Sequence, residues 1–523
     1  MVDIQREIER KYESDDSGLP DLTGVAGVEA VIDKGVAQLD ATYYDTADQR
    51  LAASSITLRR RTGGSDAGWH LKFPVAPGVR DEMRAPLSDT LPDDLAGLVR
   101  SRVRKAELVP VVRLRSARDV RDLLDVAGRL LAEVSVDAVR AERLTGGEGE
   151  AQWTEIEVEL ADGTDPVFLD QVEKRLRKAG VRPSASASKL ARALSETDPE
   201  ARKAGRARKA HKARTGAGKK SAGKSAPASQ EPPVTAGDHV LAYLRAQRDA
   251  IVELDPAVRQ DVEDSVHSMR VATRRMRGTF KSYAKVLDRA VTDPVGEELR
   301  WLAGELGVDR DREVLTERLT AALAEVPDPL VSGPVGARLA RWASDSRGGS
   351  RGHLIGVLDS ARYLTLLDTL DALIAHPPLR EAAGKKPGKV IAGAVRRDFG
   401  KVAGLVGEAL ELSPGPERDI AVHEARKRTK RTRYAAEAAT LALGAPARDL
   451  AKAMKSLQSL LGDHQDSVMA RQTLRELSAV AHAAGESAFT YGLLYGREER
   501  RAAAVEAELP GFWTGIKDGA AAL

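Results

Sequence analysis

The sequence predicts a multidomain α+β protein, in which an eight-stranded β barrel with flanking helices precedes an all-α part made of a duplicated helical bundle. The length of 523 residues exceeds what one ordinary hydrophobic core supports. Short alternating runs separated by Gly, Pro and Asp fill the chain up to about residue 181 and predict strands. From residue 238 onward, long segments rich in Ala, Leu and Arg and broken by proline, as at Pro256 and Pro294, predict helices.

Eight segments of the N-terminal part have the alternation of half-buried strands. They are REIERKY (6–12), ATYYDT (41–46), SITLRRR (55–61), WHLKFPV (69–75), RDEMRAPL (80–87), VPVVRLRSAR (109–118), LAEVSVDAVRAER (131–143) and WTEIEVEL (153–160). Eight is the number of strands that a small closed barrel needs. One helix is expected between the strands at 92–101, and two are expected after them at 167–181 and 188–194.

The charged faces of these strands are the main anomaly of the N-terminal part. The first and last strands each place charged side chains in a row on one face: Glu7, Glu9, Lys11, Glu155, Glu157 and Glu159. The middle strands carry mostly basic side chains: Arg59, Arg61, Lys72, Arg84, Arg113 and Arg115. For any single strand, a solvated outer face is the ordinary explanation. Acids at both ends of the strand order and bases between them favour a closed barrel with the charges inside, because closure brings the first and last strands together.

Carboxylates gathered in this way repel one another unless a cation lies between them. Because the chain has no cysteine, a metal here needs oxygen or nitrogen ligands, and Mg²⁺ and Mn²⁺ prefer carboxylates. An opposing wall of arginine and lysine suits a phosphate chain, because a guanidinium group binds two phosphate oxygens at once. A metal and several cations around a phosphate chain are what phosphoryl transfer needs.

Five blocks in this order resemble the CYTH domains, the triphosphate tunnel metalloenzymes: EIERKY, YYDTADQRLAASSITLRRR, WHLKFP, WTEIEVEL and SASASKLARAL. The resemblance covers residues 1–197 and implies an eight-stranded antiparallel β tunnel that binds triphosphates and usually hydrolyses them with a divalent metal, Mg²⁺ or Mn²⁺. It implies catalytic roles for Glu7, Glu9 and Lys11, and metal binding by Glu7, Glu9, Glu155, Glu157 and Glu159. It implies triphosphate binding by Lys11, Arg59, Arg61, Lys72, Arg84, Arg113, Arg115 and Lys189. Arg84 is a departure, because it stands where a second acid is expected after Glu82.

Residues 198–237 have the composition of a flexible basic linker. Residues 201–224 hold ten Lys or Arg and no Asp or Glu, so the rest of the chain has 71 basic and 78 acidic residues. No aromatic residue lies among these cations, so they offer no stacking platform for bases. The segment is either a solvated spacer or a non-specific arm for a polyanion, with polyphosphate and nucleic acid equally suitable.

The helical part carries an internal repeat of about 155 residues, which divides it into 238–385 and 386–515. VHSMRVATRRMR (266–277) and VHEARKRTKRTR (422–433) share six of twelve positions. Each carries a His and a cluster of basic side chains: His267, Arg270, Arg274, Arg275 and Arg277, then His423, Arg426, Lys430, Arg431 and Arg433. Salt bridges to neighbouring helices are one explanation of these clusters. Two copies about a pseudo-two-fold axis would instead form a continuous cationic groove, which suits an extended polyanion.

These helices, together with LGVDRDREVL and LQSLLGDHQDSV, resemble the CHAD domains, which are named for conserved histidines in an α-helical fold. The resemblance covers about residues 236–515 and implies two pseudo-symmetric four-helix bundles whose basic residues bind inorganic polyphosphate. The first copy has Asp309-Arg310 where the second has His464-Gln465. We therefore expect the two halves to bind unequally.

The two resemblances together imply a metal-dependent triphosphatase, which hydrolyses inorganic triphosphate or short polyphosphate in the tunnel and binds polyphosphate on the helices. The alternatives are a thiamine or nucleoside triphosphatase or an adenylyl cyclase on the same tunnel, and a non-catalytic polyphosphate-binding adaptor. The sequence has no N-terminal apolar signal and no run of eighteen apolar residues, so we expect no membrane partner and a cytoplasmic protein, associated with polyphosphate granules where these form. No particular oligomeric state is predicted.

Overall fold

The computed structural model describes residues 4–14, 18–198, 232–307, 310–344 and 347–520. The chain forms two compact units, Met1–Ser225 and Ala226–Leu523. The predicted basic linker, 198–237, falls largely in 199–231, outside the described residues. Its suggested role as a polyanion arm stays a prediction.

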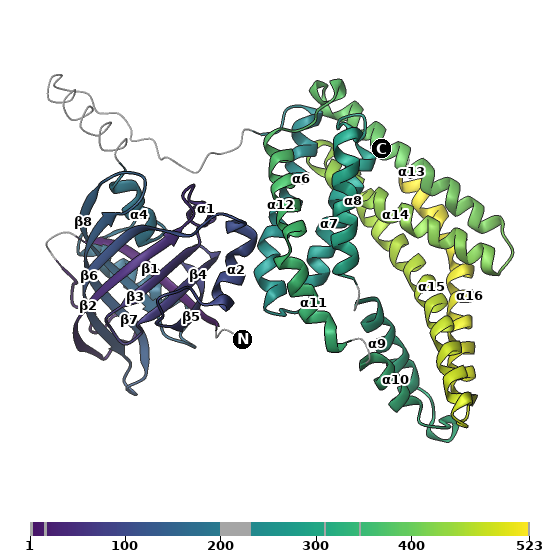
Figure 1. Ribbon diagram of the computed structural model, residues 1–523, viewed down its shortest axis with the longest axis horizontal. Helices are drawn as coiled ribbons and strands as arrows, with labels where there is room; N and C mark the ends of the chain where they lie inside the picture. The colour runs from purple at the N-terminus through teal and green to yellow at the C-terminus, as the bar shows by residue number, and fades with distance from the viewer. Residues whose placement is uncertain (1–3, 15–17, 199–231, 308–309, 345–346, 521–523) are drawn as a thin grey trace. The chain divides into compact units, whose positions relative to one another are not determined.

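The N-terminal unit is a closed ring of eight antiparallel strands (Figure 1). In chain order the strands are β1 (Ile4–Ser14), β2 (Ala30–Asp45), β3 (Thr57–Thr62), β4 (Gly68–Ala76), β5 (Val79–Pro86), β6 (Val109–Leu124), β7 (Leu130–Arg143) and β8 (Glu150–Leu160). Their order is β5-β4-β3-β2-β6-β7-β8-β1, and β1 pairs again with β5 to close the ring. The predicted eight-stranded tunnel is confirmed, with its first and last strands as neighbours.

The register of these two strands brings the predicted acids together. β1 and β8 pair with Glu9 opposite Glu159 and Lys11 opposite Glu157. Because side chains alternate along a strand, Glu7 points to the same side of β1 as Glu9 and Lys11. Glu7, Glu9 and Glu157 are all buried. The carboxylates of the first and last strands therefore face the inside of the barrel.

The apolar faces of the strands point outward and are covered by helices. The helices are α1 (Arg50–Ala53), α2 (Asp93–Val103), α3 (Val167–Lys178) and α4 (Lys189–Glu196). One outer core packs β3, β4 and β5 against α1 and α2, and another packs β1, β7 and β8 against α3. Apolar burial contributes about 25 cal/mol for each Å² removed from water. The hydrophobic stabilisation of this barrel therefore comes mainly from its outer surface, which is the reverse of an ordinary barrel.

The last helix of the unit enters one end of the barrel. Ser188 caps α4, since its Oγ accepts a hydrogen bond from the Ala191 N–H at 3.1 Å. Leu190 of α4 packs with Leu114 and Trp153, which share the inner faces of β6 and β8 with the charged residues. A two-residue strand, β9 (Arg182–Pro183), pairs with β1 just before this helix. An apolar plug thus fills one end of the tunnel.

Asp45 and Thr46, the Asp-Thr pair of the second sequence block, stabilise the turn after β2. The carboxylate of Asp45 is buried and accepts hydrogen bonds from the backbone N–H groups of Thr46 (2.7 Å), Leu51 (2.9 Å) and Ala52 (2.8 Å). The hydroxyl of Thr46 accepts one from the Arg50 N–H at 3.0 Å. These bonds satisfy N–H groups that the start of α1 leaves without helical partners. The block therefore fixes the path of the chain into β3.

The second unit is all-helical (Figure 1). Its helices are α6 (Ala236–Arg259), α7 (Ser265–Ser282), α8 (Arg289–Glu305), α9 (Arg310–Ala324), α10 (Val335–Ser344), α11 (Arg347–Asp359), α12 (Ala361–Ala375), α13 (Pro387–Glu411), α14 (Pro416–Leu443), α15 (Ala445–Ala483) and α16 (Phe489–Ala520). Pro256 and Pro294 do not break helices as the sequence predicts but lie inside α6 and α8. Pro256 lies in the last turn of α6, and Pro294 lies in the second turn of α8. None of the described helices is long and apolar enough to cross a membrane.

Two hydrophobic cores hold the helical unit together. The larger joins α6–α8 and α11–α14 with the first half of α15 and the end of α16. The smaller joins α9 and α10 with the second half of α15 and the start of α16. Helices α9 and α10 of the first sequence repeat thus pack on α15 and α16 of the second. The sequence pattern does not indicate this exchange of helices between the two repeats.

The repeated Leu-Gly pair of each half has a packing role. At Gly307 a Cβ atom would lie 2.6 Å from Cζ of Arg270, and at Gly462 it would lie 3.5 Å from Nε of Arg426. Gly307 therefore lets Arg270 lie directly on the backbone of the following segment, whereas a side chain at Gly462 would make only an ordinary contact with Arg426. The two helices that carry these arginines, α7 and α14, meet at Gly278, where a Cβ would lie 3.2 Å from the Tyr434 ring.

Candidate functional site

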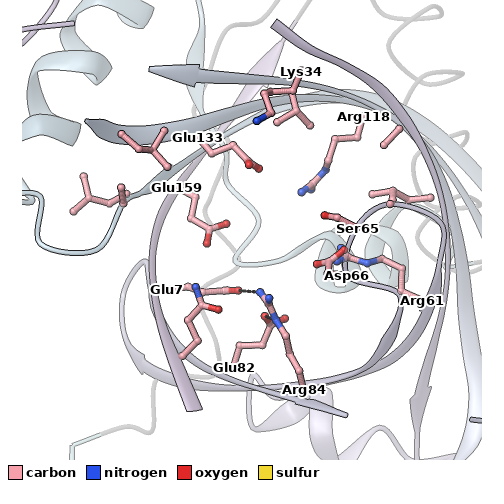
Figure 2. A pocket seen from close by; sticks show the side chains of 18 of the residues that line it. Glu7, Lys34, Arg61, Ser65, Asp66, Glu82, Arg84, Arg118, Glu133 and Glu159 are labelled. Atoms are coloured by element: carbon pink, nitrogen blue, oxygen red, sulfur yellow. Dashed lines mark hydrogen bonds and ion pairs between the residues drawn. The ribbon is translucent and has the colours of Figure 1, made fainter. Parts of the chain in front are cut away.

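The tunnel holds a cavity of about 780 Å³. Its acidic lining residues are Glu7, Asp66, Glu82, Glu133, Glu159 and Asp162, and its basic ones are Arg6, Lys34, Arg59, Arg61, Lys72, Arg84 and Arg118. Figure 2 shows Glu7 and Glu159 on one wall, with Arg61 and Arg118 on the wall that faces them. The cavity therefore offers carboxylates on one side and guanidinium groups on the other.

Glu7 lies on the acidic wall and is only 3% exposed. Lys72 Nζ is 2.5 Å from Glu7 Oε2 and 3.3 Å from Glu82 Oε1. Burial raises the pKa of Glu7 to about 7, and Glu82 and Glu159 add to this effect against the attraction of Lys72. Burial also raises the pKa of Glu159. This wall is short of positive charge, and oxygen ligands in that condition suit a hard divalent cation.

Glu82 is a tunnel carboxylate that the sequence prediction left out. Its Oε1 lies 2.9 Å from His70 Nδ1 and 3.8 Å from Arg59 Nη2, and its other oxygen contacts Arg84. Burial opposes ionisation, but His70, Lys72 and Arg59 outweigh it and lower the pKa of Glu82. Its alternation with Arg84 on one face of β5 is the signal that could have identified it. Arg84 itself lies in the cavity, 3.6 Å from Glu7 Oε1, as a cation where an acid was expected.

The next layer of the tunnel consists of Glu9, Lys11 and Glu157. Lys11 Nζ lies 2.9 Å from Glu9 Oε2 and contacts Glu157. Although burial alone would raise them, Lys11 lowers the pKa of Glu9, and Lys11 and Lys189 lower that of Glu157. Glu9 and Lys11 also line a separate cavity of about 510 Å³ with Arg80. This layer is charged and internally paired.

Glu155, predicted as a metal ligand, lies deeper still. Lys189 Nζ lies 3.0 Å from Asp137, 2.7 Å from Glu155 and 2.6 Å from Glu157. The Trp153 indole N–H donates to Glu155 Oε2 at 2.6 Å. Oxygen atoms of the three carboxylates lie within 4.8 Å of one another, a spacing that could hold a metal. Here the ammonium group of Lys189 already lies among them.

The basic wall includes Arg118, which the sequence prediction missed. Its Nη2 lies 2.8 Å from Asp137 Oδ2 and 2.9 Å from Glu157 Oε2. Only the register of β6 against β7, with Arg118 opposite Asp137, makes this residue recognisable. Its position in the cavity lining makes it a phosphate-binding candidate.

Arg113 and Arg115 do not lie in the tunnel, so their predicted role in tunnel phosphate binding is wrong. They alternate with Leu114 and face away from the side of β6 that carries Arg118. There Arg113 Nη2 is 2.6 Å and Arg115 Nε is 3.7 Å from Asp40 Oδ2. The error has a simple cause, because a one-residue change of phase exchanges the two faces of a strand.

Arg59 and Arg61, two of the residues that the sequence predicts to bind phosphate, lie on the basic wall of the cavity. Arg59 Nη1 donates to Tyr43 Oη at 3.3 Å. Burial would raise the pKa of Tyr43, but the charge of Arg59 lowers it. Burial, together with Arg59 and Arg118, lowers the pKa of Arg61 to about 9, although Arg61 contacts Asp66. Three guanidinium groups are therefore crowded on this wall, and Asp66 does not restore the pKa of Arg61 to its ordinary value.

The helical unit holds a cavity of about 460 Å³ formed by α7, α9, α14 and α15. Seven predicted residues line it, three from the first repeat and four from the second: His267, Arg270, Arg274, His423, Arg426, Lys430 and Arg433. Arg318 of α9 also lines it and was not predicted. His423 Nδ1 lies 2.6 Å from Gln465 Oε1, so one of the two residues that differ between the copies reaches the cavity. The basic faces of both repeats thus meet in one place.

A second basic cavity, of about 580 Å³, shares Arg274, Lys430 and Tyr434 with the first. Its basic lining residues are Arg274, Arg277, Lys281, Arg300, Lys427, Arg428, Lys430 and Arg431. Arg275 lines neither cavity, and its Nε lies 2.9 Å from Glu437 Oε2. Two contiguous cavities therefore connect the basic faces of α7 and α14.

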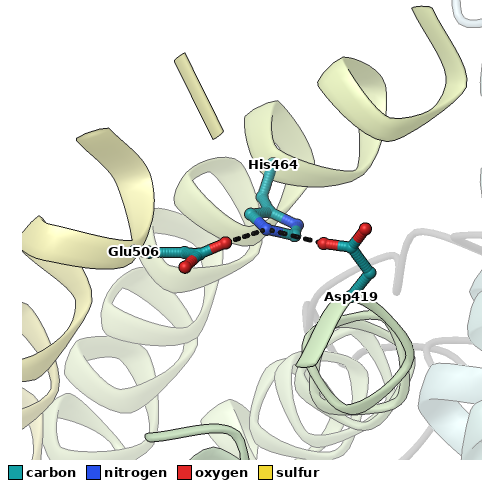
Figure 3. A group of neighbouring side chains, drawn as sticks. All are labelled: Asp419, His464 and Glu506. Atoms are coloured by element: carbon teal, nitrogen blue, oxygen red, sulfur yellow. Dashed lines mark hydrogen bonds and ion pairs between the residues drawn. The ribbon is translucent and has the colours of Figure 1, made fainter. Parts of the chain in front are cut away.

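A buried histidine links three helices elsewhere in the unit (Figure 3). His464 Nε2 lies 3.1 Å from Glu506 Oε1 and 3.4 Å from Asp419 Oδ1. These residues could hold a metal by their spacing. Arg418 and Arg471, however, each lie 3.2 Å from the second oxygen of one carboxylate. Because two arginines already balance the two acids, the group is an ion-pair network that joins α14, α15 and α16.

Comparison with known proteins agrees with both halves of this geometry. The model of the CYTH domain matches residues 5–194, and that of the CHAD domain matches residues 242–475. Two uncharacterized Mycobacterium tuberculosis proteins, MT2285 of strain CDC 1551 / Oshkosh and Rv2226 of strain ATCC 25618 / H37Rv, are each 38% identical to the chain over 509 residues. The match covers 94% of this chain and 92% of each relative.

Solved structures resemble the two parts separately. The match to PptA from Streptomyces chartreusis (22% identity, TM-score 0.46) covers 54% of this chain and 100% of the PptA chain. The CHAD domain from the plant Ricinus communis (22%, 0.42) covers 57% and 96%. An adenylyl cyclase-like protein from Hippeastrum with a dominant triphosphatase activity (19%, 0.23) covers 35% and 93%.

Proposed function

Because the chain belongs to the proteins that join a CYTH domain to a CHAD domain, we propose that its tunnel hydrolyses short inorganic polyphosphates, tripolyphosphate above all, and that its helical unit binds polyphosphate. One observation supports the tunnel reaction most directly. A single cavity has on one wall the carboxylates Glu7 and Glu159, whose pKa values burial raises, and on the facing wall the guanidinium groups of Arg61 and Arg118. A phosphate chain with a divalent cation would complement both walls at once.

The basic wall would bind and align the phosphate chain. Arg59, Arg61 and Arg118 present guanidinium groups, which suit pairs of phosphate oxygens. Lys72 and Arg84 now contact the acids Glu7 and Glu82, and they would exchange these contacts for phosphate oxygens when the acids gain another cation. Holding the chain at several points in line would supply the orientation that phosphoryl transfer requires.

The carboxylates fit a hard divalent cation. Glu7 and Glu159 face the cavity with too little positive charge around them, and Glu9 lies opposite Glu159 in the strand register. When bound there, Mg²⁺ or Mn²⁺ would offset the charge of the phosphate chain and favour attack by water on the terminal phosphorus. Glu157, with Lys11, would hold Glu9 in position behind this wall.

The helical unit supports polyphosphate binding through its two connected basic cavities. Arg270 and Arg426, equivalent in the two repeats, line the first cavity, and Arg277 and Arg431 line the second. A linear polyanion could contact both cavities through the residues that they share. Such binding should weaken as salt concentration rises, because it releases counterions.

Phosphate release from tripolyphosphate, ATP and thiamine triphosphate, each with Mg²⁺, Mn²⁺ or EDTA, would test the tunnel reaction against its alternatives. Fastest release from tripolyphosphate, abolished by EDTA, is the expected result. Preference for ATP or thiamine triphosphate would favour a nucleoside or thiamine triphosphatase, and cyclic AMP formed from ATP would favour a cyclase. Binding without release of phosphate from any substrate would favour the polyphosphate-binding adaptor.

The Glu7→Gln substitution tests the location of the reaction. It removes a charge from the acidic wall, so it should abolish phosphate release while leaving binding of long-chain polyphosphate nearly unchanged. Asp81→Asn is the matched control, because Asp81 lies on the opposite face of β5 from Glu82 and pairs with the exposed Arg6 at 2.8 Å. Loss of both release and binding in Glu7→Gln alone would contradict the division of labour between the units.

The double substitution Arg270→Glu with Arg426→Glu tests the helical unit in the reverse direction. It should weaken polyphosphate retention at least tenfold and leave tripolyphosphate hydrolysis unchanged. The matched control is Arg448→Glu with Arg475→Glu, which makes the same charge change at exposed positions that line neither basic cavity. Equal losses of retention in the two double variants would mean that net charge, not the cavities, holds the polymer.

A further inference from the structure

The loop between β3 and β4 places a carboxylate on the basic wall of the tunnel. Asp66, in this loop, contacts Arg61 through an ion pair, and both residues line the cavity. Figure 2 shows Asp66 beside Arg61, across the cavity from Glu7 and Glu159. Within the described parts of the chain, no other acid lies within ion-pair distance of Arg61. Any phosphate that reaches Arg61 must therefore displace Asp66 or share the Arg61 guanidinium group with it.

The fold holds this loop in place. Gly63 and Gly64 have φ values of 80° and 74°, and a Cβ at Gly63 would lie 2.0 Å from the carbonyl oxygen of Gln38. The ring of His70 is buried, and its Nε2 lies 2.9 Å from the Asp66 carbonyl oxygen. The position of Asp66 on Arg61 is thus built into the turn and its buried anchor.

Asp66 differs from the other acids that contact tunnel cations. Lys72 and Arg118 contact carboxylates on the barrel strands, which belong to the acidic wall or to the deeper paired layer. The side chain of Asp66 comes from a loop and keeps 32% of its surface exposed, whereas that of Arg61 is 5% exposed. Asp66 can therefore leave for solvent when another anion takes its place, and Arg61 stays behind.

We propose that Asp66 is a specificity-determining residue, which occupies Arg61 as a resident anion and yields it more readily to a free terminal phosphoryl group than to an esterified one. A terminal phosphoryl group carries about −1.5 to −2 charges at pH 7. A phosphoryl group that bridges to an ester carries about one, the same as the carboxylate that it would replace. Beside Arg59 and Arg118, the exchange gains attraction only in the first case.

The inference names the substrate class of the tunnel and rests on the proposed function. Inorganic tripolyphosphate has a free terminal group at each end, so one can occupy Arg61 in either direction. A nucleoside or thiamine triphosphate has one free end and one esterified end. Arg61 is the last tunnel-facing residue of β3 before the exposed loop. When the organic group of such a substrate stays outside the tunnel, its esterified phosphoryl group is the one that lies nearest to Arg61. Asp66 should therefore favour inorganic chains.

The test compares tripolyphosphate with ATP in full-length Asp66→Asn and wild-type protein. The ratio of kcat/KM for tripolyphosphate to that for ATP, measured with Mg²⁺, should fall about tenfold in Asp66→Asn, chiefly because ATP improves. Asp162→Asn is the matched control, since Asp162 lines the same cavity and is exposed, with no ion pair recorded among the described residues. Asp66→Glu, which keeps the charge, should keep most of the wild-type ratio.

Titration calorimetry in EDTA separates this inference from the proposed function. The ratio of Kd values for the two ligands should move in the same direction in Asp66→Asn, because binding at Arg61 needs no hydrolysis and the helical unit is unchanged. The wild-type tunnel could bind tripolyphosphate while the ratio of Kd values shifts equally, or not at all, in Asp66→Asn and Asp162→Asn. That result would overturn the role of Asp66 and leave the proposed function standing. A wild-type protein that neither hydrolyses nor binds tripolyphosphate or ATP would overturn both proposals.

Discussion

Replacing Glu7 by glutamine should change the pH dependence of the stability of the tunnel. Glu7 is buried, and its pKa is raised from an ordinary value of 4.5 to about 7. A carboxyl group that binds its proton more tightly when folded stabilises the fold below its unfolded pKa. That contribution is lost as the pH rises from about 4.5 through about 7, because the folded protein must then ionise a buried acid.

The size of this effect follows from the pKa of Glu7. Each factor of ten in proton affinity is worth about 1.4 kcal/mol, so the change from 4.5 to about 7 corresponds to about 3 kcal/mol between pH 4 and pH 8. Glutamine cannot ionise and loses nothing over this range. The difference in unfolding free energy between Glu7→Gln and wild type should therefore move by about 3 kcal/mol in favour of the variant. For a domain of this size, that is a relative rise in Tm of about 6–12 °C.

Calorimetry of the full-length protein in EDTA at pH 4.5 and pH 8 would measure this difference. EDTA matters, because a metal bound by Glu7 would stabilise the ionised form and hide the effect. Asp81→Asn, on the outer face of β5, serves as the control and should keep a constant difference from wild type at both pH values. If Glu7→Gln also kept a constant difference, Glu7 would be ionised normally in the folded protein, and the acidic wall would not lack positive charge.

Three further predictions follow from particular contacts. Arg118→Leu removes one of the cations that pair with the buried Asp137 and Glu157, so urea unfolding should show a loss of about 3 kcal/mol and calorimetry at least tenfold weaker tripolyphosphate binding, whereas Arg115→Leu should change neither. Gly307→Ala would place Cβ 2.6 Å from Cζ of Arg270, so polyphosphate retention should weaken severalfold with no change in charge. His464→Phe removes the shared partner of two acids and should lower the unfolding free energy of the helical unit by about 2 kcal/mol in urea unfolding, without weakening polyphosphate binding.

The architecture of the tunnel was predictable because its strands invert the usual pattern. Alternating acids on the first and last strands, with bases between them, favour a closed ring in which the charged faces point inward. The structure confirms the closed ring, with Glu9 opposite Glu159. The helical exchange was not predictable, because α9 and α10 have apolar faces that would suit either bundle, and only the tertiary packing selects α15 and α16.

The tunnel site was less predictable than the fold, because the sequence shows which charged residues are present but not which residues they contact. Arg113 and Arg115 have the composition of a phosphate-binding strand, yet they face Asp40 on the other side of β6. Arg118 could be recognised only from its register with Asp137. Asp66 lies in a glycine-containing loop, and no pattern in the sequence indicates that its carboxylate turns back onto Arg61.

The inverted barrel also explains why its charges can serve a reaction. Buried charges without partners cost several kcal/mol each, so a barrel lined with them is stable only if apolar packing elsewhere offsets the cost. Here that packing is on the outside, where α2 and α3 cover the strands, and the apolar plug of α4 fills only one end. The interior thereby keeps two deficits of counter-charge: Lys72 does not bring the pKa of Glu7 down to its ordinary value, and Asp66 does not bring that of Arg61 up to its own. A ligand that carries both a cation and phosphates would relieve both deficits, so its binding should stabilise the empty tunnel more than either ion alone.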